Sequence, residues 1–376
     1  MLTDKPRLPL LSIALTGFLP SVLKSWIYRL KGYRIGKGVK FGLGSVLIGK
    51  DVEVGDYSSF GLLSVIRGDR IRIGSHVEFR AMSIFDTPHL EIGDGTRINE
   101  QVFVGGLQSA TSKLIVGRNC QIMQMTFINP ARSITIGDDS GIGGHCLIFG
   151  HSSWLSEFEG YPVDFEDIVI GKSVSLTWRV FVLPGTKIGD GAVIGANSLV
   201  RGEVPGRCLA VGFPARVVSR EPDFPRPMST DDKRQVLEKL LAEYDQFLTE
   251  YGFQCRRDET LFHVEDPKTG RSWVMQLVRG GDQAVSETSV SRDISLVLSL
   301  PALPLGTRED LDQQRIPWID IASKDRSDQG NQFTEETVQF LRRYGVRLYR
   351  PGWPHTEAAA SSSTPPGTMP NTRSAA

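Results

Sequence analysis

The 376-residue sequence has few cysteines and no net charge. Its four cysteines are scattered and form no CxxC pair, at Cys120, Cys146, Cys208 and Cys255. Free thiols in a reducing cytoplasm fit this usage better than a disulfide framework does. Lys and Arg number 43, as do Asp and Glu, so nothing in the charge balance suggests a nucleic acid as a partner. We therefore expect a cytoplasmic protein that binds no nucleic acid.

The sequence also lacks an apolar run long enough to span a membrane. Residues 8–23 are sixteen uncharged residues, short of the roughly 20 that a spanning helix needs, and Pro9, Gly17 and Pro20 interrupt them. They show no cleavage pattern typical of a signal peptide. Residues 1–50 contain nine Lys or Arg and one acid, so this end is strongly basic. Either residues 1–34 form a helical cap on the fold, or residues 8–34 make a peripheral contact with the inner face of a membrane.

A repeat of six residues dominates the sequence. Its blocks mostly open with a phrase such as IRIG, LEIG, ITIG or IVIG. A period of six fits neither an α-helix nor a simple strand, but it fits a triangular coil with one inward apolar side chain on each of three faces. The sequence therefore predicts a mostly β fold, a parallel β-helix over residues 35–220. The inward residues are predicted to be Ile48, Val54, Phe60, Ile73, Phe79, Phe85, Ile92, Ile98, Val104, Val116, Ile122, Ile128, Ile136, Ile142, Ile148, Ile170, Leu176, Val182, Ile188, Ile194 and Val200.

The spacing between coils reveals where the repeat is interrupted. The interval from Ile170 to Ile188 is 18 residues, a perfect coil, whereas the interval from Ile136 to Ile170 is 34. About sixteen extra residues must therefore leave the prism, and they begin near His151. A long excursion from a regular scaffold is usually functional.

Three motifs connect this repeat with a known family. They are Gly150–His151 at the start of the extruded loop, LPGTKIGDGAVIGANSLV at 183–200, and GFPARV at 212–217. Together they resemble hexapeptide-repeat O-acetyltransferases of the maltose, galactoside and polysaccharide type. The resemblance implies a left-handed β-helix, a homotrimer whose sites use two chains, acetyl-CoA as the co-substrate and no metal.

The histidine at the start of the loop is the candidate catalytic base. Acyl transfer to a hydroxyl needs a group that takes the proton, and imidazole is suited to this at neutral pH. The resemblance assigns this role to His151. His145 is a rival within a regular coil, and His89 could line an acceptor groove or be an exposed corner residue. A metal site at His145, Cys146 and His151 matches no familiar zinc spacing.

The resemblance also implies where the two substrates bind. Matching positions near CoA are Trp178, Ala196, Arg201, Gly202 and Arg216. A small side chain at Ala196 permits close approach of pantetheine, and the two arginines could clamp phosphates or be solvated surface charges.

The candidate acceptor-binding residues are Trp154, Met123 and Asp86. The sequence departs from the family at Met123, where the galactoside branch has an asparagine, and at 131–132, where Ala and Arg replace an acidic pair. These departures leave the acceptor open. On the CoA side, the usual Val-Trp-Ile-Gly reads Val-Ser-Leu-Thr at 174–177, with a tryptophan displaced to Trp178.

Residues beyond 220 lie outside the repeat. Residues 221–252 are predicted to be a Pro-rich linker and an amphipathic helix, capped at Ser229 or Thr230 and ended at Gly252. Residues 253–350 are predicted to be a small α+β module with a hairpin turn at 268–270, and residues 351–376 a disordered tail.

Three functions follow from these features. The first is an O-acetyltransferase that moves an acetyl group from acetyl-CoA to a saccharide or a glycosylated small molecule. The second is an N-acyltransferase on an amino sugar or nucleotide sugar. The third is a non-catalytic β-helix that scaffolds polysaccharide biosynthesis.

Overall fold

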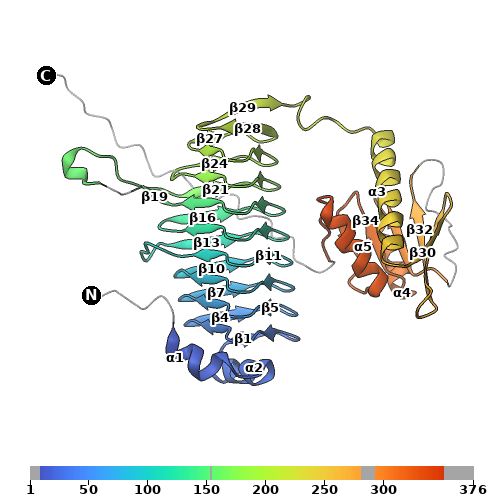
Figure 1. Ribbon diagram of the computed structural model, residues 1–376, viewed down its shortest axis with the longest axis horizontal. Coiled ribbons are helices and arrows are strands. Elements are labelled where there is room, and N and C mark those ends of the chain that lie inside the picture. The colour runs from blue at the N-terminus through green and yellow to red at the C-terminus, as the bar shows by residue number, and fades with distance from the viewer. Residues whose placement is uncertain (1–8, 153–154, 281–292, 351–376) are drawn as a thin grey trace.

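The computed structural model describes residues 9–152, 155–280 and 293–350. They form a helical cap, a long β-helix and an α+β module beside it (Figure 1). This confirms the predicted fold class, a left-handed parallel β-helix with an N-terminal helical cap and a C-terminal α+β module. Trp154 and the predicted disordered tail lie outside the described residues.

Three parallel sheets form the faces of the β-helix, and we call them faces A, B and C. Face A contains β1 (Arg34–Ile35), β4 (Asp51–Val54), β7 (Arg70–Ile73), β10 (His89–Ile92), β13 (Lys113–Val116), β16 (Ser133–Ile136), β21 (Ile168–Ile170), β24 (Lys187–Ile188) and β27 (Glu203–Val204). Face B contains β2 (Lys40–Phe41), β5 (Ser59–Phe60), β8 (Glu78–Phe79), β11 (Arg97–Ile98), β14 (Gln121–Ile122), β17 (Gly141–Ile142), β22 (Ser175–Leu176), β25 (Val193–Ile194), β28 (Cys208–Gly212) and the antiparallel β29 (Ala215–Arg220). Face C contains β3 (Val46–Ile48), β6 (Val65–Arg67), β9 (Ile84–Asp86), β12 (Phe103–Val104), β15 (Phe127–Asn129), β18 (Leu147–Phe149), β23 (Phe181–Val182) and β26 (Leu199–Val200).

The core of the β-helix is a stack of apolar side chains, one from each face of each coil. Every predicted inward residue except Ile48 belongs to this buried core. The prediction of Ile48 is wrong by one position, because Leu47 is the residue of β3 that packs in the core. The chain from Leu47 on face C to Val54 on face A spans seven positions rather than six, so the corner between faces C and A holds one extra residue.

The corner between faces B and C is built from residues in the left-handed backbone region. One residue per coil has a positive φ there, including Met125 (59°), His145 (57°), Arg179 (60°) and Asn197 (57°). This conformation turns the chain sharply and directs the side chain away from the core. His145 is exposed for this reason.

The extruded loop leaves the β-helix at the corner between faces C and A. It begins with β19 (His151–Ser152), contains a 3₁₀ turn, η2 (Glu157–Glu159), and returns through β20 (Asp164–Phe165). The two strands pair antiparallel, with His151 opposite Phe165. The loop projects away from the prism at its left side in Figure 1.

The N-terminal cap closes the first coil. It consists of α1 (Leu10–Ser12), η1 (Ile13–Gly17) and α2 (Ser21–Leu30). The side chain of Lys24 is completely buried, and burial lowers its pKa to about 8. Within the described residues no single helix is long and apolar enough to cross a membrane, although Leu10–Gly17 and Ser21–Leu30, which meet at 116°, pass that test as a pair by length and composition.

The C-terminal module is a six-stranded sheet with helices on both faces. The sheet contains β30 (Gln254–Arg257), β31 (Leu261–Asp266), β32 (Arg271–Val278), β33 (Leu296–Ser299), β34 (Trp318–Asp320) and β35 (Asp325–Arg326). Helices α3 (Thr230–Glu250) and α5 (Gln332–Arg343) share one apolar core with the sheet, while α4 (Leu305–Gln313) packs in a second. The predicted helix, hairpin and strands are present, and Ser229 caps α3 through a capping box with Asp232.

The module contacts the corner between faces A and B. Asn119 Nδ2 donates to the Leu348 carbonyl oxygen at 3.2 Å, and Arg342 donates to the Gly95 carbonyl oxygen at 3.3 Å. Arg347 donates to the carbonyl oxygens of Asn119 and Asp139. The module therefore sits on the opposite side of the β-helix from the extruded loop (Figure 1).

Candidate functional site

His151 lies where the regular coil ends and the loop begins. Its Nε2 is 2.8 Å from the Nδ2 atom of Asn129, the last residue of β15 in the coil below. The strand register places Asn129 opposite Phe149, two residues before His151. The fold thus brings these two side chains together through the stacking of coils, although they are 22 residues apart in sequence.

The imidazole of His151 forms a hydrogen bond with the side-chain amide of Asn129. In the orientation of this amide, Nδ2 can only donate, so Nε2 of His151 accepts and the ring carries its proton on Nδ1. Asn129 is 4% exposed, and its Oδ1 is buried without a hydrogen-bond partner. A buried polar atom without a partner is costly and is typical of a functional site.

Two glycines make room for this pair. A Cβ atom on Gly106 would lie 2.5 Å from Asn129 Nδ2, and one on Gly150 would lie 3.1 Å from the backbone nitrogen of Arg132. Gly106 also has a φ of +122°, which side chains rarely allow. The close approach of Asn129 therefore depends on Gly106.

Aromatic rings surround the imidazole on the loop side. The ring of Phe165 stacks on His151 with centroids 5.9 Å apart and an angle of 24°, and the ring of Phe149 lies at 5.9 Å. Burial among these groups lowers the pKa of His151 below its ordinary value of 6.5. The imidazole is therefore neutral at pH 7, which is the state that a general base requires.

Asp86 lies along the same corner as Asn129, two coils lower. Residues 86, 105 and 129 follow the paired positions Phe85, Val104 and Ile128, so they occupy equivalent places. The coil spacing separates Asp86 from Asn129 by roughly 10 Å. Its carboxylate accepts from Arg67, with Nε to Oδ1 at 2.8 Å. Asp86 therefore lies at the same corner as Asn129 and forms an ion pair with Arg67.

Met123 lies elsewhere. It follows β14 on face B, and its sulfur accepts from Asn99 Nδ2 at 3.0 Å. Within one chain, Met123 is not at the corner that holds His151. Likewise, His89 lies on face A between Arg70 and Lys113 of neighbouring strands.

The residues predicted to bind CoA divide between corners. Trp178 and Ala196 are exposed in adjacent coils at the corner between faces B and C. Trp178 lies beside His145, with ring centroids 6.1 Å apart. Arg201 and Gly202 are exposed at the corner between faces C and A, two coils above His151.

Arg216 is on β29, the last strand of face B, and is also exposed. A single chain therefore does not bring Trp178 and Ala196 to His151, because face C separates them. A site that uses both corners requires two chains.

The side chains considered for a metal site do not point in the same direction. Cys146 points into the core, its sulfur donates to the Thr177 carbonyl oxygen at 3.1 Å, and burial raises its thiol pKa to about 11. His145 points outward from the neighbouring position. The described residues contain no group of three or more His, Cys, Asp or Glu side chains that could hold a metal ion.

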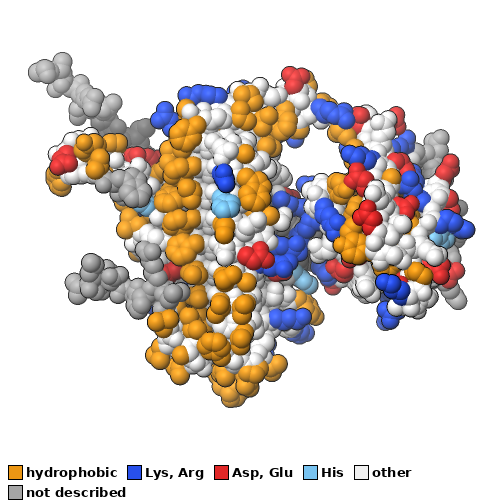
Figure 2. Space-filling view, in the orientation of Figure 1, with side chains coloured by type: hydrophobic (Ala, Val, Ile, Leu, Met, Phe, Trp, Pro, Cys, Tyr) orange, Lys and Arg blue, Asp and Glu red, His pale blue; other side chains and the backbone are white. Residues whose placement is uncertain are grey.

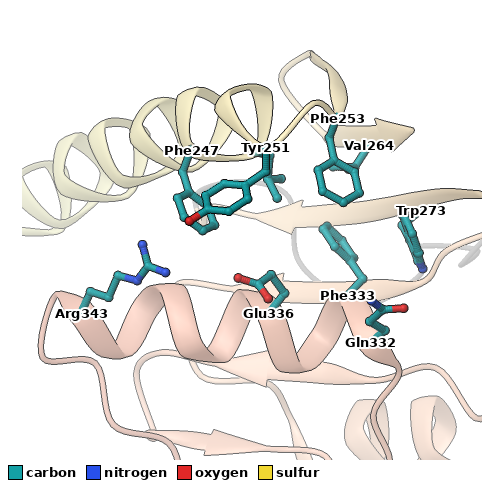
Figure 3. Close-up of a pocket in the computed structure, with 10 residues that line it drawn as sticks. Phe247, Tyr251, Phe253, Val264, Trp273, Gln332, Phe333, Glu336 and Arg343 are labelled. Atoms are coloured by element: carbon teal, nitrogen blue, oxygen red, sulfur yellow. The ribbon is translucent and has the colours of Figure 1, made fainter. Parts of the chain in front are cut away.

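A second concave site lies in the C-terminal module. A cavity of about 250 Å³ opens between α3 and α5, and Figure 3 shows aromatic side chains from both helices and the sheet pointing into it. Its polar lining comes from Gln332, Glu336 and Arg343, and the Arg343 guanidinium lies 4.3 Å from the centroid of the Phe247 ring. No local sequence pattern predicts this cavity, because its lining is assembled from four separate segments.

Comparisons with known proteins confirm the predicted resemblance. No protein-family model matches the chain. WbbJ of Escherichia coli K12, whose name assigns it provisionally as a lipopolysaccharide biosynthesis O-acetyl transferase, is 37% identical over 114 residues, which are 27% of this chain and 58% of that protein. The galactoside O-acetyltransferase of the same strain is 31% identical over 117 residues, covering 28% of this chain and 54% of that protein.

The chain spans about half the length of these curated relatives. Among solved structures, the polySia-specific acetyltransferase NeuO is similar with a TM-score of 0.36 and 23% identity, over 50% of this chain and 78% of that one.

Proposed function

We propose that this protein is an acetyl-CoA-dependent O-acetyltransferase that acts on a hydroxyl group of a saccharide or a glycosylated small molecule. The contact between His151 and Asn129 carries the proposal, because it holds an imidazole whose pKa is lowered by burial at the start of the extruded loop. The sequence relatives named as O-acetyltransferases support the type of reaction.

His151 acts as the general base. The acceptor hydroxyl displaces Asn129 from Nε2 and donates its proton there as its oxygen attacks the thioester carbonyl carbon. The C–S bond then breaks, and the imidazolium returns the proton to the leaving thiolate. Asn129 is a positioning residue, since it holds the ring and its tautomer until the acceptor arrives.

The site is proposed to form between two chains of a homotrimer. Face C supports this, because the outward column that precedes its core residues is entirely apolar, although the column that follows them includes Arg67 and Asp86. The outward columns of faces A and B carry charged residues such as Glu53, Arg72, Glu78 and Arg97. The apolar column on face C consists of Val46, Val65, Ile84, Phe103, Phe127, Leu147, Phe181 and Leu199, all in register. Val46 and Val65 are already buried within the chain, whereas the other six are half-buried or exposed and available for a subunit contact. In Figure 2, hydrophobic side chains form bands along the β-helix.

Burial of this column between subunits brings the corner with Trp178 and Ala196 of one chain to the corner with His151 of the next. The exposed loop residues Leu155, Phe158 and Tyr161 would be covered by the same contact. Trp178, Ala196, Arg201, Gly202 and Arg216 are the proposed donor-binding residues, and Asp86 and Met123 the proposed acceptor-binding ones.

Replacement of His151 tests the function. Thiol release from acetyl-CoA should be measured with a panel of hydroxyl and amino sugars for the wild type, His151→Ala and the matched control His145→Ala. Loss of the base should lower transfer by about 10²- to 10⁴-fold, whereas the control should retain it. Full transfer by His151→Ala would exclude the mechanism. Transfer confined to amino sugars would favour the N-acyltransferase, and no turnover with any acceptor would favour a scaffold.

A further inference from the structure

Helix α2 of the N-terminal cap buries side chains with polar groups and exposes apolar ones. Its fully buried side chains are Lys24 and Tyr28, whereas Val22 is 79% exposed, Trp26 59% and Leu30 67%. The exposed apolar residues are spaced four apart, so they form one stripe on the side that faces away from the β-helix. A surface helix of a globular protein normally has the reverse arrangement.

Hydrogen bonds fix this orientation. Lys24 Nζ donates to the carbonyl oxygens of Gly42 at 2.7 Å and Ser45 at 2.9 Å. The Tyr28 hydroxyl accepts from the Leu47 backbone nitrogen at 3.0 Å. Because α2 is attached to the first coil through its polar side, it cannot turn its apolar stripe inward without leaving these carbonyl groups unsatisfied.

The apolar surface continues beyond α2. The preceding segment exposes Leu10, Leu11, Leu15 and Phe18, and α2 adds Leu23. Figure 2 shows hydrophobic side chains gathered over the lower end of the β-helix, which the cap covers. A contiguous exposed apolar surface of this kind marks an interaction site.

The charge around this surface selects its partner. Of the seven Lys or Arg among residues 9–50, Lys24 is buried, and Arg34 and Lys50 pair with acids of the next coil, whereas Lys31, Lys37 and Lys40 are exposed beside the cap. Exposed apolar side chains flanked by cations are typical of segments that insert into the headgroup region of an anionic bilayer. A second copy of the cap is disfavoured as the partner, because it would bring like charges together.

We propose that the N-terminal cap docks on the surface of an anionic lipid bilayer. Val22, Trp26 and Leu30 enter the interface, the lysines contact lipid headgroups, and the β-helix projects from the membrane. The proposal does not depend on the proposed function. In a homotrimer whose axis follows the β-helix, three caps would face the same bilayer, which would strengthen binding through multivalency.

The experiment compares vesicle binding by the full chain and by two double variants. Trp26→Ser/Leu30→Ser removes the two largest side chains of the apolar stripe, and Tyr251→Ser/Leu305→Ser removes two comparably exposed large side chains from the module. All are floated with phosphatidylcholine vesicles, with or without phosphatidylserine, at low and high salt. We expect the wild type and the module variant to bind anionic vesicles with a bound fraction that falls at high salt, and the cap variant to lose at least tenfold in binding.

Three results would overturn this proposal. They are no binding of the wild type to anionic vesicles, equal binding by the cap variant, and end-to-end association in solution that the cap variant abolishes while vesicles remain unbound. Acetyl transfer to an acceptor in solution serves as an independent readout. Because the cap variant keeps His151 and the donor corner, it should retain that activity, so failure of the membrane proposal and failure of the proposed function are distinguishable.

Discussion

His145 and His151 are six residues apart in the sequence, yet their environments in the structure differ. His145 occupies a corner position that recurs in every coil, where Met125, Arg179 and Asn197 serve equally well. His151 occupies a place that no other coil has, and it is half-buried with its Nε2 against Asn129.

The two histidines therefore differ in their position relative to the repeat. A repeating corner demands a backbone conformation and tolerates many side chains, whereas an interruption of the repeat has no structural need for imidazole. The two histidines also mark two corners of the prism, and face C lies between them. Each corner carries half of the proposed site.

The largest effect on activity should come from mixed trimers, in which some chains carry a defect at one corner and the others a defect at the other corner. His151→Ala removes the base, and Ala196→Trp fills the exposed position where the donor is proposed to pass. Each homotrimer should be nearly inactive. In randomly mixed trimers formed by co-expression, a site is intact when one chain supplies His151 and its neighbour supplies Ala196, which occurs in about a quarter of the sites.

Co-expression should therefore restore about a quarter of the wild-type rate. Mixing the two preformed homotrimers under conditions that prevent subunit exchange is the control, and it should restore nothing. If both halves of a site belonged to one chain, every site in a mixed trimer would carry a defect, and co-expression would also restore nothing.

A smaller effect should appear in the pH profile of transfer. Neutral His151 is the active form, and burial lowers its pKa from 6.5, so kcat/KM should fall only as the pH drops below that value. Asn129→Asp places a carboxylate beside Nε2, which favours the imidazolium and raises its pKa. The acid limb should then move to higher pH.

Asn129→Ala is the matched control for this shift. It should lower transfer by about tenfold without an upward shift of the limb, because it removes the positioning contact and adds no charge. Thermal unfolding of all three proteins checks that the fold is retained. An unshifted limb in Asn129→Asp would contradict the role assigned to the pair.

The sequence predicted the β-helix well because its stability depends on a local rule. One apolar residue per face must point inward, so apolar residues recur about every six positions in the sequence. The rule failed at Ile48 because the corner between faces C and A holds an extra residue, which the count of six ignores. That same corner carries the loop, Asp86 and Asn129.

Asn129 was missed because it has no motif of its own. It becomes a candidate only when the interval of 20 residues from Val116 to Ile136 is used to align β15 with β18, which places it opposite Phe149. Helix α4 was missed because its sequence LGTREDLDQ has only two apolar residues and little amphipathic pattern. The parallel pairing of β32, β33 and β34 depends on contacts between distant segments, which no local pattern records.

The smallest expected effect concerns the stability of variants at His145. His145 has a φ of 57°, so His145→Gly should leave the melting temperature unchanged or slightly higher, whereas His145→Val should cost roughly 1–2 kcal/mol because a β-branched residue resists this backbone conformation. Both variants should keep their acetyl transfer per folded molecule, since the proposal assigns donor binding at this corner to Trp178 and Ala196 and not to the residue at position 145. A loss of transfer in His145→Gly at full stability would assign His145 a part in the reaction and end the distinction between the repeating and the interrupted positions.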